Sequence, residues 1–129
     1  MSKLLIVDDE VDVREFSKNF FKKRGIDVFI ASGGKQALEI IVSEKPDLVL
    51  LDVRMEEMTG VEVLKLLRQT DQVTKIIMVS GVEDIDTINE AKSLNVVGYI
   101  HKPLVLEELE RIVMSELTGS TSSPQERGG

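Results

Sequence analysis

The chain has 129 residues, 42% of them hydrophobic, which is enough for one domain with a buried core. Its net charge of −7 argues against nonspecific binding to nucleic acid or to an anionic membrane. Cysteine is absent and histidine occurs once, as His101, which excludes disulfides, thiolate zinc sites, a cysteine nucleophile and multi-histidine metal sites. The longest apolar run is far too short to span a membrane, and residues 1–3 lack a cleavage-site pattern, so we expect a soluble cytoplasmic protein.

Short apolar runs alternate with amphipathic stretches along the chain. Near-continuous apolar runs of this kind are typical of strands in a parallel sheet that is covered on both faces. The runs occupy residues 4–7, 28–31, 48–51, 76–79 and 96–100. Alternating strands and helices predict an α/β fold with right-handed crossovers.

Five stretches between and after these runs have helical periodicity. Val13, Phe16 and Phe20 share one face of the first stretch, at about residues 10–24. The other four carry Ala37, Leu38 and Ile41; Val61, Val63, Leu64 and Leu67; Ile85, Ile88 and Ala91; and Leu106, Leu109, Ile112 and Val113. We therefore expect five helices.

Residues with special backbone preferences mark the ends of these elements. Gly25 suits the C-terminal cap of the first helix, Asp84 the N-cap of the fourth, and Pro46 the stop after the second. We expect one domain over residues 1–117. Residues 118–129, TGSTSSPQERGG, have no apolar periodicity, so we expect a flexible tail or linker. The sequence leaves open whether this segment leads to a further domain or was added to the natural chain.

Acidic residues follow two of the apolar runs. Asp8 and Asp9 end the first run, and Asp52 ends the third. Ligands of an open parallel sheet bind beyond the carboxyl ends of its strands, so these acids converge if the two strands are neighbours. Unit charges about 4 Å apart repel by roughly 4 kcal/mol at an effective dielectric near 20. Such a cluster needs a bound cation, a raised pKa or an added positive side chain.

Two further strand ends carry polar groups, Ser80 with Gly81 and His101 with Lys102 and Pro103. The combined pattern resembles the receiver domain of two-component response regulators, the CheY-like superfamily, over roughly residues 3–117. The resemblance rests on LLIVDDE (4–10), LVLLDVRMEEMTG (48–60), IIMVSG (76–81) and GYIHKP (98–103). It implies a flavodoxin-like (βα)5 fold, which is a doubly wound five-stranded parallel sheet with strand order 2-1-3-4-5.

The resemblance implies that Asp52 accepts a phosphoryl group from a sensor histidine kinase or a histidine phosphotransfer protein. Attack by one anion on another needs charge neutralisation, which Mg²⁺ (or Mn²⁺) can supply through carboxylate and phosphate oxygens. Asp9 would bind the ion directly and Asp8 through water. Asp52 and the backbone carbonyl of Arg54 would complete the protein ligands.

The same resemblance assigns roles to residues around the phosphoacceptor. Lys102 would supply a second positive charge, and the bond between Lys102 and Pro103 would be cis. Arg54 and Val82 occupy positions whose side chains can shield the acyl phosphate from water.

A switch to an output surface is also implied. Ser80 would donate to a phosphoryl oxygen, and Tyr99 would respond by moving between outward and inward positions. The readout would be the face made by the fourth helix, fifth strand and fifth helix, which would contact an output domain or a downstream protein. Neither nucleic acid nor a membrane is an expected direct partner.

Three residues depart from the pattern or fit it less well. Glu56 stands where the family commonly has proline, which adds negative charge and removes rigidity from the loop after Asp52. Glu10 adds a fourth acid but also suits the first turn of a helix. His101, as a lone histidine near a strand end, suits a solvated or hydrogen-bonded position better than phosphate handling.

Other functions on the same sheet fit less well. A Mg²⁺-dependent phosphatase with an aspartyl nucleophile would need a second acid at position 54, which is Arg54. A flavin carrier would need a phosphate loop rich in hydroxyls and glycine where the chain has residues 8–10, DDE. A degenerate receiver that works without phosphate would not keep all the expected positions. We therefore expect not a conventional enzyme but a signalling receiver that catalyses its own phosphotransfer and dephosphorylation.

Overall fold

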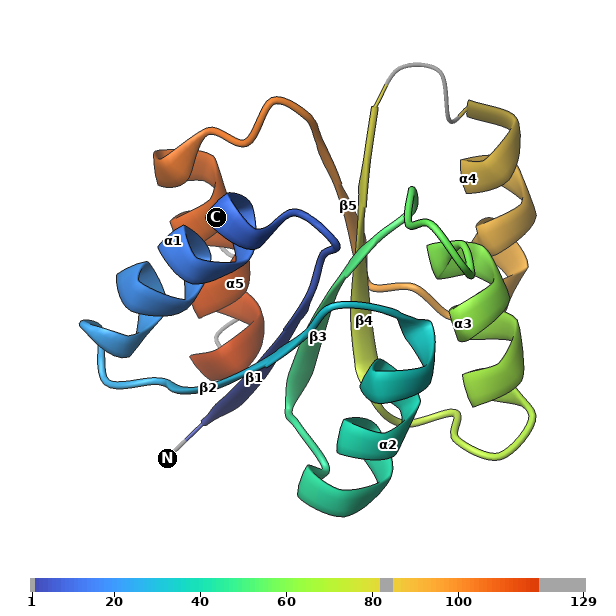
Figure 1. The fold of residues 1–129 in the computed structure, drawn as a ribbon, viewed down its shortest axis with the longest axis horizontal. Helices are drawn as coiled ribbons and strands as arrows, with labels where there is room; N and C mark the ends of the chain where they lie inside the picture. The colour runs from blue at the N-terminus through green and yellow to red at the C-terminus, as the bar shows by residue number, and fades with distance from the viewer. Residues whose placement is uncertain (1, 82–84, 119–129) are drawn as a thin grey trace.

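The computed structural model describes residues 2–81 and 85–118. Five parallel strands form one sheet in the order β2-β1-β3-β4-β5 (Figure 1). The strands are β1 Lys3–Val7, β2 Asp27–Ala31, β3 Leu48–Asp52, β4 Lys75–Ser80 and β5 Gly98–His101. The flavodoxin-like α/β fold and the strand order expected from the sequence are confirmed.

Helices cover both faces of this sheet, with α1 and α5 on one face and α2, α3 and α4 on the other (Figure 1). Their bounds are α1 Val11–Lys22, α2 Gly34–Glu44, α3 Gly60–Arg68, α4 Ile85–Ala91 and α5 Leu106–Thr118, and a 3₁₀ turn, η2 Lys92–Leu94, follows α4. Beyond Thr118, the expected tail lies outside the described residues. No helix in the described part of the chain is long and apolar enough to cross a membrane.

The hydrophobic core has two halves, one on each face of the sheet. Along β1, Leu5 and Val7 pack toward α2 and α3, whereas Leu4 and Ile6 pack toward α1 and α5. All four are buried, and full burial of one such side chain stabilises the fold by about 1.5–3 kcal/mol. The sheet is therefore held rigidly from both sides, which fixes the positions of the residues at its ends.

One of the three residues expected on the buried face of the first helix lies outside it, whereas Phe20 packs against the core. Phe16 was expected on the apolar face with Val13 and Phe20, but it is 56% exposed, while Ser17 and Phe21 are buried. A shift of one residue rotates a side chain by about 100° around a helix. The buried stripe passes through a serine, so the apolar pattern of the sequence placed Phe16, at the edge of the stripe, on the buried face.

The start of the fifth strand differs from the expectation, whereas the end of the first helix agrees with it. The fifth strand begins at Gly98 rather than at position 96, because Asn95 has a left-handed backbone with φ of 65° and ends the preceding turn. Gly25 has φ of 81°, as expected for the residue that ends the first helix. The N-cap expected at Asp84 lies outside the described residues.

Arg68, at the end of α3, joins three segments of the chain. Its buried guanidinium group donates hydrogen bonds of 2.8–2.9 Å to the backbone oxygens of Asp71, Thr74, Leu94 and Asn95. These bonds tie the loop before β4 to the turn before β5. The strand that leads to Lys102 is thereby anchored at its start.

Candidate functional site

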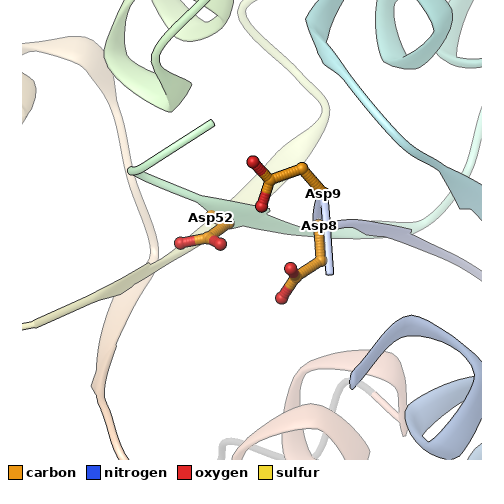
Figure 2. Close-up of side chains that lie close together, drawn as sticks. All are labelled: Asp8, Asp9 and Asp52. Carbon is orange, nitrogen blue, oxygen red and sulfur yellow. The ribbon is translucent and has the colours of Figure 1, made fainter. Parts of the chain in front are cut away.

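Three carboxylates meet at the carboxyl end of the sheet. Asp52 is the last residue of β3, and the pairing of Val7 with Leu51 places Asp8 beside it. One oxygen of each of Asp8, Asp9 and Asp52 lies within 4.8 Å of the others (Figure 2). The convergence expected from neighbouring strands is therefore present.

Hydrogen bonds fix the turn that carries Asp8. Its backbone N–H donates to Ala31 O at 3.1 Å, and its Oδ1 accepts from the backbone N–H of Glu10 at 2.8 Å. Its carbonyl oxygen accepts from Arg14 Nη1 at 2.7 Å. With one carboxylate oxygen and both backbone groups engaged, the Asp8 side chain is held toward the cluster.

Asp52 has only 2% of its surface exposed. Burial first, and then the negative charge of Asp8, raise the pKa of Asp52 from 3.8 to about 6, against the opposing effect of Lys102. Burial also raises the pKa of Asp8. The protein alone therefore compensates these charges incompletely, and a cation at this place would relieve the repulsion.

Lys102 reaches the cluster from the far side of β4. Its Nζ lies 3.1 Å from Asp52 Oδ2, and its backbone N–H donates to Ser80 O at 2.8 Å. Burial lowers the pKa of Lys102, but the hydrogen bond and the charge of Asp52 outweigh it and leave the pKa raised. The ammonium is thus charged at neutral pH. The peptide bond between Lys102 and Pro103 is cis.

Ser80, the last residue of β4, is almost completely buried, and its Oγ has no hydrogen-bond partner among the described residues. A buried hydroxyl without a partner costs about 1–3 kcal/mol. Such a group suits an acceptor that arrives from outside, such as a phosphoryl oxygen. On the neighbouring strand, Tyr99 is half-buried and packs against the core on the α3 side of the sheet.

An open cleft of about 610 Å³ leads to Asp52. Its walls are formed by Asp9, Glu10, Val53, Arg54, Met55, Glu56, Thr59, Thr87 and Lys102. The backbone N–H of Arg54 lies 3.3 Å from Asp52 Oδ1, and the Arg54 side chain is exposed at the rim. The second expected shielding position, Val82, lies outside the described residues.

The loop after β3 is held close to Asp52 by Gly60. A β-carbon at position 60 would lie 2.3 Å from the backbone oxygen of Asp52, so only glycine allows this approach. Thr59 caps α3 by accepting from the backbone N–H of Glu62, whose side chain accepts from the Thr59 N–H in return. The start of α3 is thereby held against the end of β3.

The response regulator receiver domain family matches residues 4–114 of the chain. The chain belongs to this family. The receiver is 36% identical over 115 residues to sporulation initiation phosphotransferase F of Bacillus subtilis (strain 168), a match that covers 89% of this chain and 93% of that protein. It is 35% identical over 117 residues to regulatory protein AtoC of Escherichia coli (strain K12). This match covers 91% of this chain but 25% of AtoC.

Solved structures agree with this assignment. The receiver matches the chemotaxis protein CheY4 of Vibrio cholerae with a TM-score of 0.82 at 29% identity, covering 91% of this chain and 99% of that one. It matches a response regulator receiver protein from Pseudomonas putida with a TM-score of 0.83 at 29% identity, covering 88% and 96% of the two chains. The fold is therefore that of a receiver.

The receiver also has site features that its sequence did not reveal. Thr87 of α4 lines the cleft, and Arg14 of α1 holds the backbone of Asp8. Neither has a sequence signal of its own, because each acts through a contact between separate elements. Glu56 does line the cleft, as expected from its place after Asp52, whereas His101 is exposed at the strand end opposite Ser80.

Proposed function

We propose that Asp52 is the phosphoacceptor of this receiver and that it takes the phosphoryl group from a phosphohistidine of a sensor kinase or phosphotransfer protein. The observation that carries the proposal is the placement of Lys102 Nζ 3.1 Å from the buried Asp52 carboxylate, beside two further acids and at the base of an open cleft. A carboxylate in this setting can act as a nucleophile toward phosphorus once its charge is balanced.

The donor set fits Mg²⁺ or Mn²⁺. Asp8, Asp9 and Asp52 offer hard carboxylate oxygens that lie close together, and the carbonyl oxygen of Arg54 is the further ligand that we propose. When bound, the ion neutralises charge on the acids and on the transferring phosphoryl oxygens. Asp8 and Asp9 would therefore serve to hold the ion, and Asp52 would serve both as ligand and as nucleophile.

In the transfer, a carboxylate oxygen of Asp52 forms a bond to phosphorus while the bond from phosphorus to the donor imidazole nitrogen breaks. The bonding electron pair goes to that nitrogen. The nitrogen takes a proton, and the donor histidine leaves with a neutral imidazole. Lys102 stabilises the negative phosphoryl oxygens, and the Ser80 hydroxyl donates to one of them. In support of these roles, Ser80 is the last residue of β4 and Lys102 directly follows β5.

Hydrolysis reverses the modification and sets the lifetime of the signal. Water attacks phosphorus, the bond to Asp52 breaks, and inorganic phosphate leaves. We propose that Arg54 and Val82 shield the acyl phosphate from this water. Substituting Arg54 by alanine should shorten the lifetime of the acyl phosphate, measured as the decay of the phosphorylated mass, and an unchanged lifetime would contradict the shielding role.

Phosphorylation would act on the face formed by α4, β5 and α5, with Ser80 and Tyr99 as the switch pair. We propose that one domain, which extends to the end of α5 at Thr118, performs this function and that the protein acts in the cytoplasm. Relatives such as AtoC extend well beyond the matched region, so an output domain or a separate downstream protein would read the face.

The decisive experiment is incubation with a small acyl-phosphate donor and Mg²⁺, followed by intact mass measurement. The wild-type protein should gain one phosphoryl group, and Asp52→Asn should gain none. Asp71→Asn is a matched control, because Asp71 lies in the loop before β4 at the opposite end of the sheet. Modification of Asp52→Asn to the wild-type extent would sink the proposal.

A further inference from the structure

We propose that Arg14 is a positioning residue of the cation site, acting through the backbone of Asp8. The inference rests on the proposed function, because it concerns the ion that the acids at the ends of β1 and β3 would hold. Arg14 does not belong to the acidic cluster or to the walls of the cleft. Its effect on the site therefore has to pass through the turn between β1 and α1.

The contact is specific and local. Arg14 Nη1 donates to the carbonyl oxygen of Asp8 at 2.7 Å, and both residues are at least half-buried. The donor lies one turn into α1, so the bond clamps the first turn of the helix onto the end of β1. Charge-assisted hydrogen bonds of this length are the stronger ones in proteins.

The clamp completes a set of bonds that orient Asp8. The Asp8 N–H is held by Ala31, Oδ1 by the N–H of Glu10, and the carbonyl oxygen by Arg14. Of these three partners, the first two are backbone groups, and only Arg14 can be removed by substitution. Loss of the clamp would let the turn rotate and would move the carboxylates of Asp8 and Asp9 relative to Asp52.

The direction in which Mg²⁺ affinity changes on substitution distinguishes a positioning role of Arg14 from a purely electrostatic one. The guanidinium group is positive, so as a charge it opposes the binding of a divalent cation nearby. If Arg14 acted only through its charge, replacing it by alanine would tighten Mg²⁺ binding. A positioning role predicts weaker binding instead, because partners that orient metal ligands typically contribute strongly to affinity.

The chain offers a matched control on the same helix. Lys18 lies one turn further along α1 and forms an exposed pair with Glu15, with Nζ 3.6 Å from Oε1. Lys18→Ala removes one positive charge, as Arg14→Ala does, but leaves the turn at Asp8 untouched. Arg14→Lys retains the charge and one donor on a flexible stem, so it should restore binding in part.

The test is titration of each purified full-length protein with MgCl₂ by isothermal calorimetry at low ionic strength. We expect Arg14→Ala to raise the dissociation constant of Mg²⁺ about tenfold. Arg14→Lys should fall between Arg14→Ala and the wild type, and Lys18→Ala should remain within about twofold of the wild type. Far-ultraviolet circular dichroism checks that every variant is folded. If Arg14→Ala is unfolded, the comparison is made between Arg14→Lys and the wild type.

Phosphorylation supplies a second readout. With an acyl-phosphate donor, the Mg²⁺ concentration for half-maximal rate should rise in Arg14→Ala, while the rate at saturating Mg²⁺ stays near that of the wild type. An unchanged or lower dissociation constant in Arg14→Ala, or no rescue by Arg14→Lys, would overturn the inference alone. Absence of Mg²⁺ binding by the wild type would overturn the proposed cation site and this inference with it.

Discussion

Lys102 and Asp52 lie on strands that are separated by β4, yet the Lys102 ammonium reaches across it to within 3.1 Å of Asp52 Oδ2. Asp52 is 2% exposed, so the pair is largely shielded from solvent on the carboxylate side. In the proposed transfer, we expect the Lys102 ammonium to stabilise the negative phosphoryl oxygens more strongly here than an exposed lysine could.

Replacing Lys102 by alanine should lower the rate of phosphorylation by about a hundredfold, because one positive group no longer stabilises the phosphoryl oxygens. The rate is measured as phosphoryl incorporation from a small acyl-phosphate donor at saturating Mg²⁺. Lys75→Ala is the control, because Lys75 pairs with Glu116 at the start of β4, away from the acids. Equal rates for Lys102→Ala and Lys75→Ala would refute the role of Lys102.

The raised pKa of Asp52 predicts a pH-dependent stability in buffer without divalent ions. Burial and the charge of Asp8 raise the Asp52 pKa from 3.8 to about 6, so the folded protein binds this proton more tightly than the unfolded chain does. The contribution of Asp52 to stability is therefore greatest at low pH and is lost as pH rises from about 4 to about 6.

Asp52→Asn removes this titration. Its free energy of unfolding should exceed that of the wild type by about 3 kcal/mol at pH 7.5, and the difference should shrink toward zero near pH 4. Urea unfolding in the presence of a chelator measures both values, with the exposed Asp27→Asn as control. A difference that does not change with pH would contradict the prediction, and adding Mg²⁺ should stabilise the wild type but not Asp52→Asn.

The unpartnered hydroxyl of Ser80 predicts opposite effects on stability and on signalling. Ser80→Ala should stabilise the unphosphorylated protein by about 1 kcal/mol, because it removes a buried oxygen that lacks a hydrogen bond. The chain contains one tyrosine and no tryptophan, so intrinsic fluorescence reports on Tyr99 alone. Phosphorylation should change this fluorescence in the wild type but not in Ser80→Ala.

Urea unfolding supplies the stability measurement for this variant. Ser43→Ala, on the exposed surface of α2, is the matched control and should alter neither the stability nor the fluorescence response. If Ser80→Ala destabilised the protein by more than Ser43→Ala did, the hydroxyl would have a partner that stabilises the resting state.

Glycine at position 60 predicts a steric dependence of the site. Gly60→Ala should destabilise the fold by about 2 kcal/mol and slow phosphorylation, because a β-carbon would meet the backbone oxygen of Asp52 at 2.3 Å. Gly98→Ala is the control, since its β-carbon would meet nothing closer than Ile77 Cγ1 at 3.9 Å. Thermal unfolding and the phosphorylation rate measure the two effects, and equal behaviour of the two variants would exclude a close-approach role for Gly60.

Much of this site could be predicted from local sequence patterns. Asp52 was expected at the end of a strand because an apolar run stops there, and Lys102 because it follows the last run. Both expectations depend only on where a near-continuous apolar run stops and on the rule that side chains at strand ends line the binding edge. The family resemblance then supplied the strand order that places β4 between them, and the structure agrees.

Features that depend on how one element packs on another were beyond the sequence. The prediction for α1 was wrong at Phe16, which satisfies the helical period as well as Ser17 does but is exposed. The contact of Arg14 with the Asp8 carbonyl joins side chain and backbone across a turn, and no apolar pattern marks it.

The sequence by itself determined which chemical groups stand at the strand ends and, with the family resemblance, predicted their roles. This was possible because the end of a buried strand shows in the sequence as the place where a continuous apolar run gives way to polar residues. Only the tertiary structure decided the distances, the missing partner of Ser80 and the close approach at Gly60. These properties arise when segments far apart in the chain pack together, and their free energies depend on the neighbours that each group finally meets.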